Sequence, residues 1–215
     1  MKSLPSNRIE DKTALSEILL YSLPAMGVGF SFFLLTTYFL KFGTDVLLIA
    51  PATLSLIFAA AKIWDAVSDP LIGYLSDRTR HRMGRRRSWI AASSLPLALS
   101  FFLLWNPNPA LSGTALNLWV GCAIIAYFTA YTLFYVPHEA WGAEISLDHH
   151  DRTRVFGIKH AVHYCGNLLA LVALYFIMTA EQQRDAVYWI TLAIAVFLFF
   201  SIILPVWQLK ERPEH

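Results

Sequence analysis

The chain has 215 residues, of which 56% are hydrophobic and 15% are charged, and its mean hydropathy is +0.49. This composition excludes an ordinary soluble domain and indicates an all-α, polytopic membrane protein. The net charge of +2 comes largely from short basic clusters between apolar runs, which the topology of a membrane protein explains without a nucleic-acid partner.

Six apolar runs are long enough to cross a bilayer, which takes about 20 mostly apolar residues. They cover residues 15–41, 46–75, 89–106, 115–137, 155–179 and 187–208. Fourteen of the 17 Lys and Arg residues fall on the side of the N-terminus, whereas the other side holds only Lys41 and Arg184. By the positive-inside rule we expect a plasma (inner) membrane protein with both termini in the cytoplasm, residues 1–14 forming a cytoplasmic segment and 15–209 a bundle of six transmembrane helices.

The second run contains three ionisable residues, Lys62, Asp65 and Asp69. Their spacing places them within an arc of about 60° on one helical face. Each charge would cost roughly 2.5–3.5 kcal/mol against lipid, so we expect this face to meet a polar interior. The two carboxylates can bind a monovalent cation, or one can hold a proton while the other is ionised. The alternative is a structural network in which they neutralise Lys62 or a cation of a neighbouring helix.

Two further stretches carry a family resemblance. The loop with Gly73, Asp77, Gly84, Arg85 and Arg86 is similar in kind to the loop between helices 2 and 3 of the major facilitator superfamily. The preceding Trp-Asp-Ala-Val-Ser-Asp-Pro at 64–70 resembles the glycoside-pentoside-hexuronide:cation symporters, which include the sodium/melibiose carriers. Residues 137–157 are similar to the loop between helices 4 and 5 of the same family.

The resemblance implies one half of a twelve-helix transporter, with residues 210–215 starting the central linker and a second six-helix half as partner. It implies that Asp65 and Asp69 bind the coupling cation, Na⁺ or H⁺, and that Lys62 stands where the family has a basic residue. Neither a cofactor nor another metal site is expected.

The motif Asp-Arg-Thr-Arg occurs at 77–80 and again at 151–154. We expect a salt-bridged cytoplasmic gate between these two loops, as an alternative to basic residues that serve topology alone. Its candidate residues are Gly73, Asp77, Arg78, Gly84, Arg85, Arg86, Glu144, Asp151 and Arg152.

Polar residues of the first, fourth and fifth runs are candidates for a substrate cavity: Gly29, Thr132, Tyr135, His138, Lys159, His163 and Asn167. The alternatives are helix packing for Gly29, hydroxyls bonded to their own backbone, and Lys159 extending to the interface. The sodium/melibiose carriers have sugar-binding acids on helices 1 and 4. At the aligned positions this chain has Val28-Gly29 and Tyr135, so both acids are missing.

The resulting hypothesis is cation-coupled symport of a sugar or glycoside by alternating access. A transporter of a lipid or other amphiphile on the same scaffold is the alternative, because the sugar-binding acids are missing. A truncated, non-transporting membrane subunit is a third. An enzyme is not expected, since the histidines fit no metalloenzyme spacing and Cys122 and Cys165 lie in apolar runs.

Overall fold

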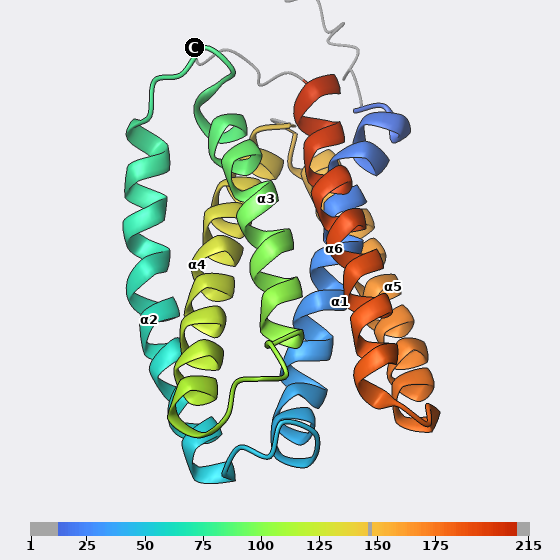
Figure 1. The fold of residues 1–215 in the computed structure, drawn as a ribbon. Helices are drawn as coiled ribbons and strands as arrows, with labels where there is room; N and C mark the ends of the chain where they lie inside the picture. The colour runs from blue at the N-terminus through green and yellow to red at the C-terminus, as the bar shows by residue number, and fades with distance from the viewer. Residues whose placement is uncertain (1–12, 146–147, 210–215) are drawn as a thin grey trace, which may run out of the picture.

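The computed structural model describes residues 13–145 and 148–209, which form six helices (Figure 1). Most of the expected cytoplasmic segment and the start of the linker lie outside the described residues. The helices are α1 (Leu15–Asp45), α2 (Pro51–Arg78), α3 (Arg85–Trp105), α4 (Gly113–Ile145), α5 (His149–Thr179) and α6 (Gln183–Gln208). The expected all-α fold, half of a major facilitator fold, is confirmed.

Five of these helices are long and apolar enough to cross a membrane: α1, α3, α4, α5 and α6. The sixth, α2, has 28 residues, but Lys62, Asp65 and Asp69 lower its hydropathy. A helix of that length extends about 42 Å, which exceeds the roughly 30 Å of hydrocarbon in a bilayer. The protein is therefore an integral membrane protein with a polar patch in one of its long helices.

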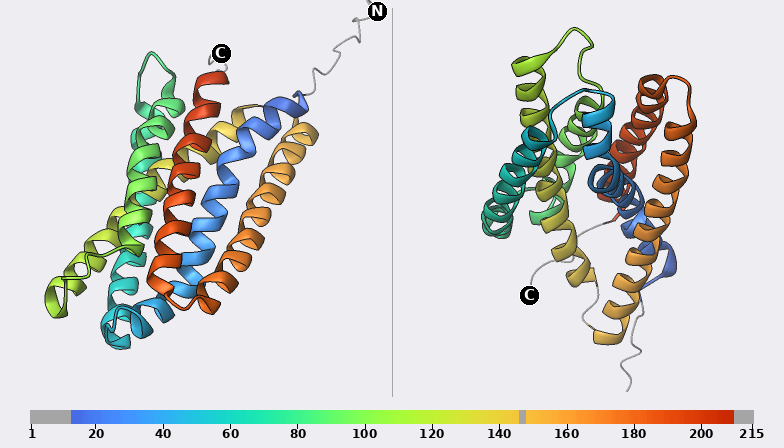
Figure 2. Two further views of the ribbon diagram at one scale, coloured as in Figure 1. Left: turned by 45° about the vertical axis from the view of Figure 1, so that its right-hand side comes forward. Right: turned by 90° about the horizontal axis from the view of Figure 1, so that it is seen from below.

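The helices form two groups of three (Figures 1 and 2). In one group α1 packs against α5 and α6, and in the other α4 packs against α3 and α2. The contact between α3 and α6 joins the groups. An aromatic cluster between α3 and α1 also joins the groups, because the ring centroid of Trp105 in α3 lies 5.0 Å from that of Phe39 and 5.3 Å from that of Phe42 in α1.

The faces of α2 and α5 that point away from the bundle are exposed and largely apolar. Only a narrow stripe of α2 is buried: Leu54, Ala61, Ser68, Ile72 and Ser76. The exposed large side chains of α5 are Tyr164, Leu168, Leu169, Leu171, Val172, Tyr175, Phe176 and Met178. These two faces leave a broad apolar surface that the six helices do not cover themselves.

Candidate functional site

The ionisable residues of α2 meet a hydroxyl group from α4. Lys62 Nζ lies 3.2 Å from Asp65 Oδ2. The buried Thr132 Oγ1 of α4 lies 2.9 Å from Asp69 Oδ1 and 3.3 Å from Asp65 Oδ1. A hydroxyl has one proton, so Thr132 donates to one carboxylate at a time while holding both near one point. Thr132, expected in the substrate cavity, thus lies with the two aspartates.

We call the group formed by Lys62, Asp65, Asp69 and Thr132 the α2–α4 cluster. It has the chemistry of a site for a hard cation. With all groups ionised, two carboxylates and one ammonium leave one net negative charge. Carboxylate and hydroxyl oxygens are ligands that hard cations prefer. Lys62 Nζ lies 4.2 Å from the ring centroid of Phe128. This cation–π contact helps to hold the ammonium group at one side of the two carboxylates. A bound monovalent cation would make the cluster neutral.

A pocket of about 210 Å³, lined by both apolar and polar side chains, lies between α1, α4 and α5. Its lining residues are Ala25, Val28, Phe32, Tyr131, Phe134, Tyr135, His138, Glu139, Lys159, His160, His163 and Tyr164. Four of the expected cavity residues are among them: Tyr135, His138, Lys159 and His163. Gly29, Thr132 and Asn167 are not. We call this space the central pocket.

An ion pair crosses the central pocket between Glu139 of α4 and Lys159 of α5. The Lys159 side chain is 4% exposed and that of Glu139 is 28% exposed, so the pair is largely shielded from solvent. Sequence reasoning missed Glu139, because the fourth apolar run ends at residue 137 whereas α4 continues to Ile145. Its position four residues after Tyr135 is the signal that would place both on one face of a longer helix.

His138 joins α4 to α1 through reciprocal hydrogen bonds. The Tyr21 hydroxyl donates to His138 O at 3.0 Å, and His138 Nε2 lies 3.0 Å from Tyr21 O. The two rings stack with centroids 4.4 Å apart. His138 borders the central pocket, but its ring nitrogen is engaged with the α1 backbone, so it holds the wall in place.

Gly29 lies where α1 crosses α5. A Cβ on Gly29 would lie 2.4 Å from His163 O, and one on Gly166 would lie 2.0 Å from Met26 O. Glycine is therefore required on both helices for this close approach. Asn167 lies in the same crossing, with Oδ1 3.0 Å from the ideal Gly29 Cβ. Its Oδ1 is buried and has no hydrogen-bond partner among the described residues.

Ion pairs tie together the ends of α2, α3 and α4 next to the basic loop. Glu144 Oε1 lies 2.8 Å from Arg85 Nη2 and 2.8 Å from Arg86 Nη2. Arg86 Nη2 also lies 3.3 Å from Asp77 Oδ1. Gly84, at φ 108°, has the positive φ that glycine tolerates and immediately precedes α3. These ion pairs join the loop between α2 and α3 to Glu144 at the end of α4.

The other gate candidates also make contacts of their own. Asp151 Oδ2 accepts hydrogen bonds from Thr13 N at 3.0 Å and Thr13 Oγ1 at 2.5 Å, which fixes the start of α1 on α5. Arg152 follows it in the first turn of α5. The Arg78 guanidinium lies over the Tyr74 ring at 4.0 Å. Gly73 makes an ordinary contact with Val136 at 3.6 Å.

Comparison with known proteins places these features in a family. Residues 20–215 match the family described as MFS/sugar transport protein. The chain is 30% identical to an uncharacterised symporter of Synechocystis sp., over 83% of this chain and 33% of the relative. It is 31% identical to the sodium-dependent lysophosphatidylcholine symporter 1 of Xenopus tropicalis, over 61% of this chain and 25% of the relative.

A further relative is the inner membrane symporter YicJ of Escherichia coli, 29% identical over 63% of this chain and 29% of the relative. The chain spans about a quarter to a third of the length of these curated relatives.

Proposed function

Because this chain belongs to the MFS/sugar transport protein family of the major facilitator superfamily, we propose that it forms the amino-terminal half of a cation-coupled symporter. The observation that carries this proposal is the bridge from Thr132 of α4 to Asp65 and Asp69 of α2. It brings hard oxygen ligands from two helices to one point. The coupling ion is Na⁺ or H⁺, and no other metal or cofactor takes part.

Coupling follows from the charge of the α2–α4 cluster. An uncompensated negative charge is costly to enclose, so the cation-free cluster resists closure against a second half. A bound cation removes the net charge and lowers this cost. Cation binding would thereby favour the enclosed state through which a bound substrate passes in alternating access.

A sugar or glycoside is the substrate that we propose first. The pocket offers an acceptor in Glu139, a donor in Lys159 and the stacked rings of Tyr131 and Tyr135, whose centroids lie 5.3 Å apart. Sugar hydroxyls both donate and accept hydrogen bonds, while the ring faces of a sugar are apolar. A site with convergent polar groups on an aromatic wall suits both properties.

A lysophospholipid or similar amphiphile is the second candidate. Gly29 and Tyr135 stand where acids would bind a sugar, and several relatives are sodium-dependent lysophosphatidylcholine symporters. The adjacent opposite charges of Glu139 and Lys159 suit a zwitterionic headgroup equally well. Competition by free sugars for uptake would count against this candidate.

A second six-helix half is the partner that we propose for the apolar faces of α2 and α5. These helices flank the central pocket and the α2–α4 cluster, so a partner on this side would enclose both. We place the protein in the plasma (inner) membrane with both termini in the cytoplasm. The Arg85–Glu144 and Arg86–Asp77 pairs would then tie the helix ends on the cytoplasmic side.

Uptake by the full-length protein in liposomes tests the proposal. Labelled glycosides and lysophospholipids are each offered under an inward Na⁺ gradient, under an inward H⁺ gradient, and without either. We expect one gradient to stimulate uptake of one class, and Asp65→Asn and Asp69→Asn to abolish the stimulation. Asp45→Asn is the matched control, because Asp45 pairs with Lys41 at the opposite end of the bundle from the basic loop. Uptake at the same rate with and without either gradient would overturn the proposal that transport is coupled to a cation.

A further inference from the structure

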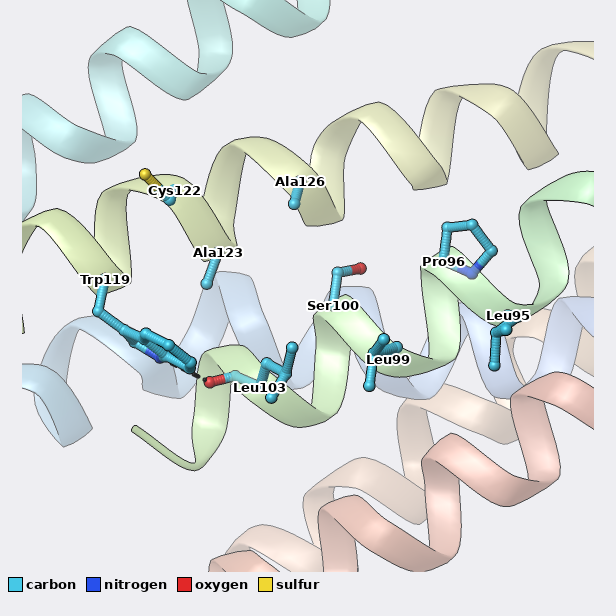
Figure 3. Close-up of a pocket in the computed structure, with 9 residues that line it drawn as sticks. All are labelled: Leu95, Pro96, Leu99, Ser100, Leu103, Trp119, Cys122, Ala123 and Ala126. Carbon is cyan, nitrogen blue, oxygen red and sulfur yellow. Dashed lines mark hydrogen bonds between the residues drawn. The ribbon is translucent and has the colours of Figure 1, made fainter. Parts of the chain in front are cut away.

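A second cavity, of about 470 Å³, lies between α3 and α4 (Figure 3). We call it the α3–α4 groove. Leu95, Leu99 and Leu103 of α3 line one side, and Cys122 and Ala126 of α4 line the other. Ser100 and Ala123 lie between them, Pro96 lies toward one end, and Trp119 stands at the other.

The groove lies on the side of α4 that faces away from the central pocket. At 3.6 residues per turn, its residues 119, 122, 123 and 126 are centred roughly 140° from the pocket residues 131, 135 and 138. Leu95 is 59% exposed and Leu99 is 49% exposed, so the groove opens to the outside of the bundle. A second half that encloses the central pocket therefore leaves this groove facing the bilayer.

The lining of the groove offers an occupant almost no hydrogen bonds. Ser100 Oγ donates to Leu97 O at 3.2 Å. Trp119 Nε1 donates to Leu103 O at 3.1 Å, a bond drawn in Figure 3. The remaining lining side chains are apolar apart from the weakly polar Cys122 thiol. The occupant must therefore be hydrocarbon in the part that enters.

The length of the groove fits one leaflet. From Leu95 to Leu103 the helix rises about 12 Å, close to half of the roughly 30 Å hydrocarbon thickness of a bilayer. The groove ends at Trp119, and tryptophan is enriched at the level of lipid headgroups. The middle of the bilayer then lies toward Leu95 and Pro96.

From this geometry we propose that the α3–α4 groove binds one acyl chain of a bilayer phospholipid. The lipid belongs to the leaflet farther from the basic loop, with its headgroup next to Trp119. Small side chains at Ser100, Cys122, Ala123 and Ala126 leave the space, and the three leucines form its wall. The site depends on membrane insertion and not on the coupling mechanism, so it stands independently of the transported substrate.

Photolabelling of the full-length protein tests the site. The protein in detergent micelles receives increasing fractions of a phosphatidylcholine with a diazirine on its acyl chain, and adducts are mapped after irradiation. We expect labelling of Leu95, Leu99 and Cys122 to saturate at low probe fraction. Labelling of the exposed Val196 and Phe200 of α6 should rise in proportion to the probe, as for lipid that merely surrounds the protein.

A matched pair of variants separates binding from general lipid contact. Ala126→Phe fills the groove, and we expect it to reduce labelling of Leu99 and Cys122 several-fold. Ala193→Phe adds the same ring at an exposed alanine of α6 and should change nothing in the groove. The proposal would be overturned if labelling of the groove rose linearly with the probe fraction and were unchanged in Ala126→Phe. It would also be overturned if groove residues stayed unlabelled but cross-linked to a second copy of the chain.

Discussion

Thr132 holds two carboxylates near one point, so its hydroxyl is the smallest group whose removal tests the proposed cation site. Thr132→Val keeps the shape of the side chain but removes the oxygen that lies 2.9 Å from Asp69 Oδ1. An interaction with a charged group contributes about 1.5–3 kcal/mol, and 1.4 kcal/mol is a factor of ten in affinity. If Na⁺ is the coupling ion, we expect the Na⁺ concentration for half-maximal substrate binding to rise by about tenfold.

Thr129→Val is the control for this change. Thr129 lies one turn earlier on α4, where its Oγ1 accepts a hydrogen bond from Trp64 Nε1 at 2.8 Å and donates to Ile125 O at 2.8 Å. Neither partner is a carboxylate, so its loss should leave the Na⁺ dependence unchanged. Equal Na⁺ dependence in Thr132→Val and Thr129→Val would show that Thr132 does not contribute to cation binding.

Gly166 makes a second prediction, about stability. Gly166→Ala places a methyl group 2.0 Å from Met26 O, which forces α1 and α5 apart. Overpacking of this kind costs about 1–3 kcal/mol, so thermal unfolding in detergent should begin several degrees lower. Gly157→Ala on the same helix meets nothing within 4 Å, and the better helix propensity of alanine should leave stability equal or higher. Equal melting of the two variants would contradict the crossing geometry.

Single residues differ in how far the sequence predicts them. Lys62, Asp65 and Asp69 are found by spacing alone, because helical periodicity fixes neighbours on one helix. Thr132 is 63 residues from Asp69, and only the packing of α4 on α2 brings the two together. Gly29 is assigned to the cavity by resemblance, whereas the α5 backbone lies against it in the structure.

Whole helices are predicted more reliably than their ends. All six expected runs lie largely within observed helices, but α4 extends eight residues beyond residue 137 and α5 begins six residues before 155. Hydropathy detects the part of a helix that lies in hydrocarbon. The added turns carry charged residues, and their helical backbone is stabilised by side-chain contacts such as Glu144 with Arg85 and the Asp148 cap at Asp151 N.

The Glu144 contacts predict energetic coupling between the ends of α3 and α4. We expect a double-mutant cycle of Arg86→Ala and Glu144→Ala to give a coupling free energy of unfolding of about 1 kcal/mol, at the upper end for ion pairs near a surface. The Arg86 side chain is only 12% exposed, which limits screening by solvent. The Lys41–Asp45 pair is the control, since its side chains are 54% and 52% exposed and such pairs give about 0.3–0.5 kcal/mol. A coupling free energy no larger than that of the Lys41–Asp45 pair would show that the Glu144 contacts contribute little to stability.

At the scale of the molecule, the sequence predicts the number of helices but not their neighbours. Apolar length identifies each helix independently of the others. The main contacts of α1 are with α5, more than 100 residues away, although α2 follows it directly in the chain. Close approach at Gly29 and Gly166 makes that pairing possible, and the hydropathy of either helix alone contains no sign of its partner.

The distribution of basic residues predicts the orientation of the whole bundle in the membrane, and a fusion experiment tests it. The loop between α2 and α3 belongs to the basic side, and the loop between α3 and α4 contains no Lys or Arg. Green fluorescent protein fused after Arg82 should fluoresce, because it folds in the cytoplasm, whereas alkaline phosphatase fused there should be inactive. Fusions after Asn108 should show the reverse. The opposite pattern would place the Glu144 ion pairs on the outer side, and the lipid at Trp119 would then belong to the cytoplasmic leaflet.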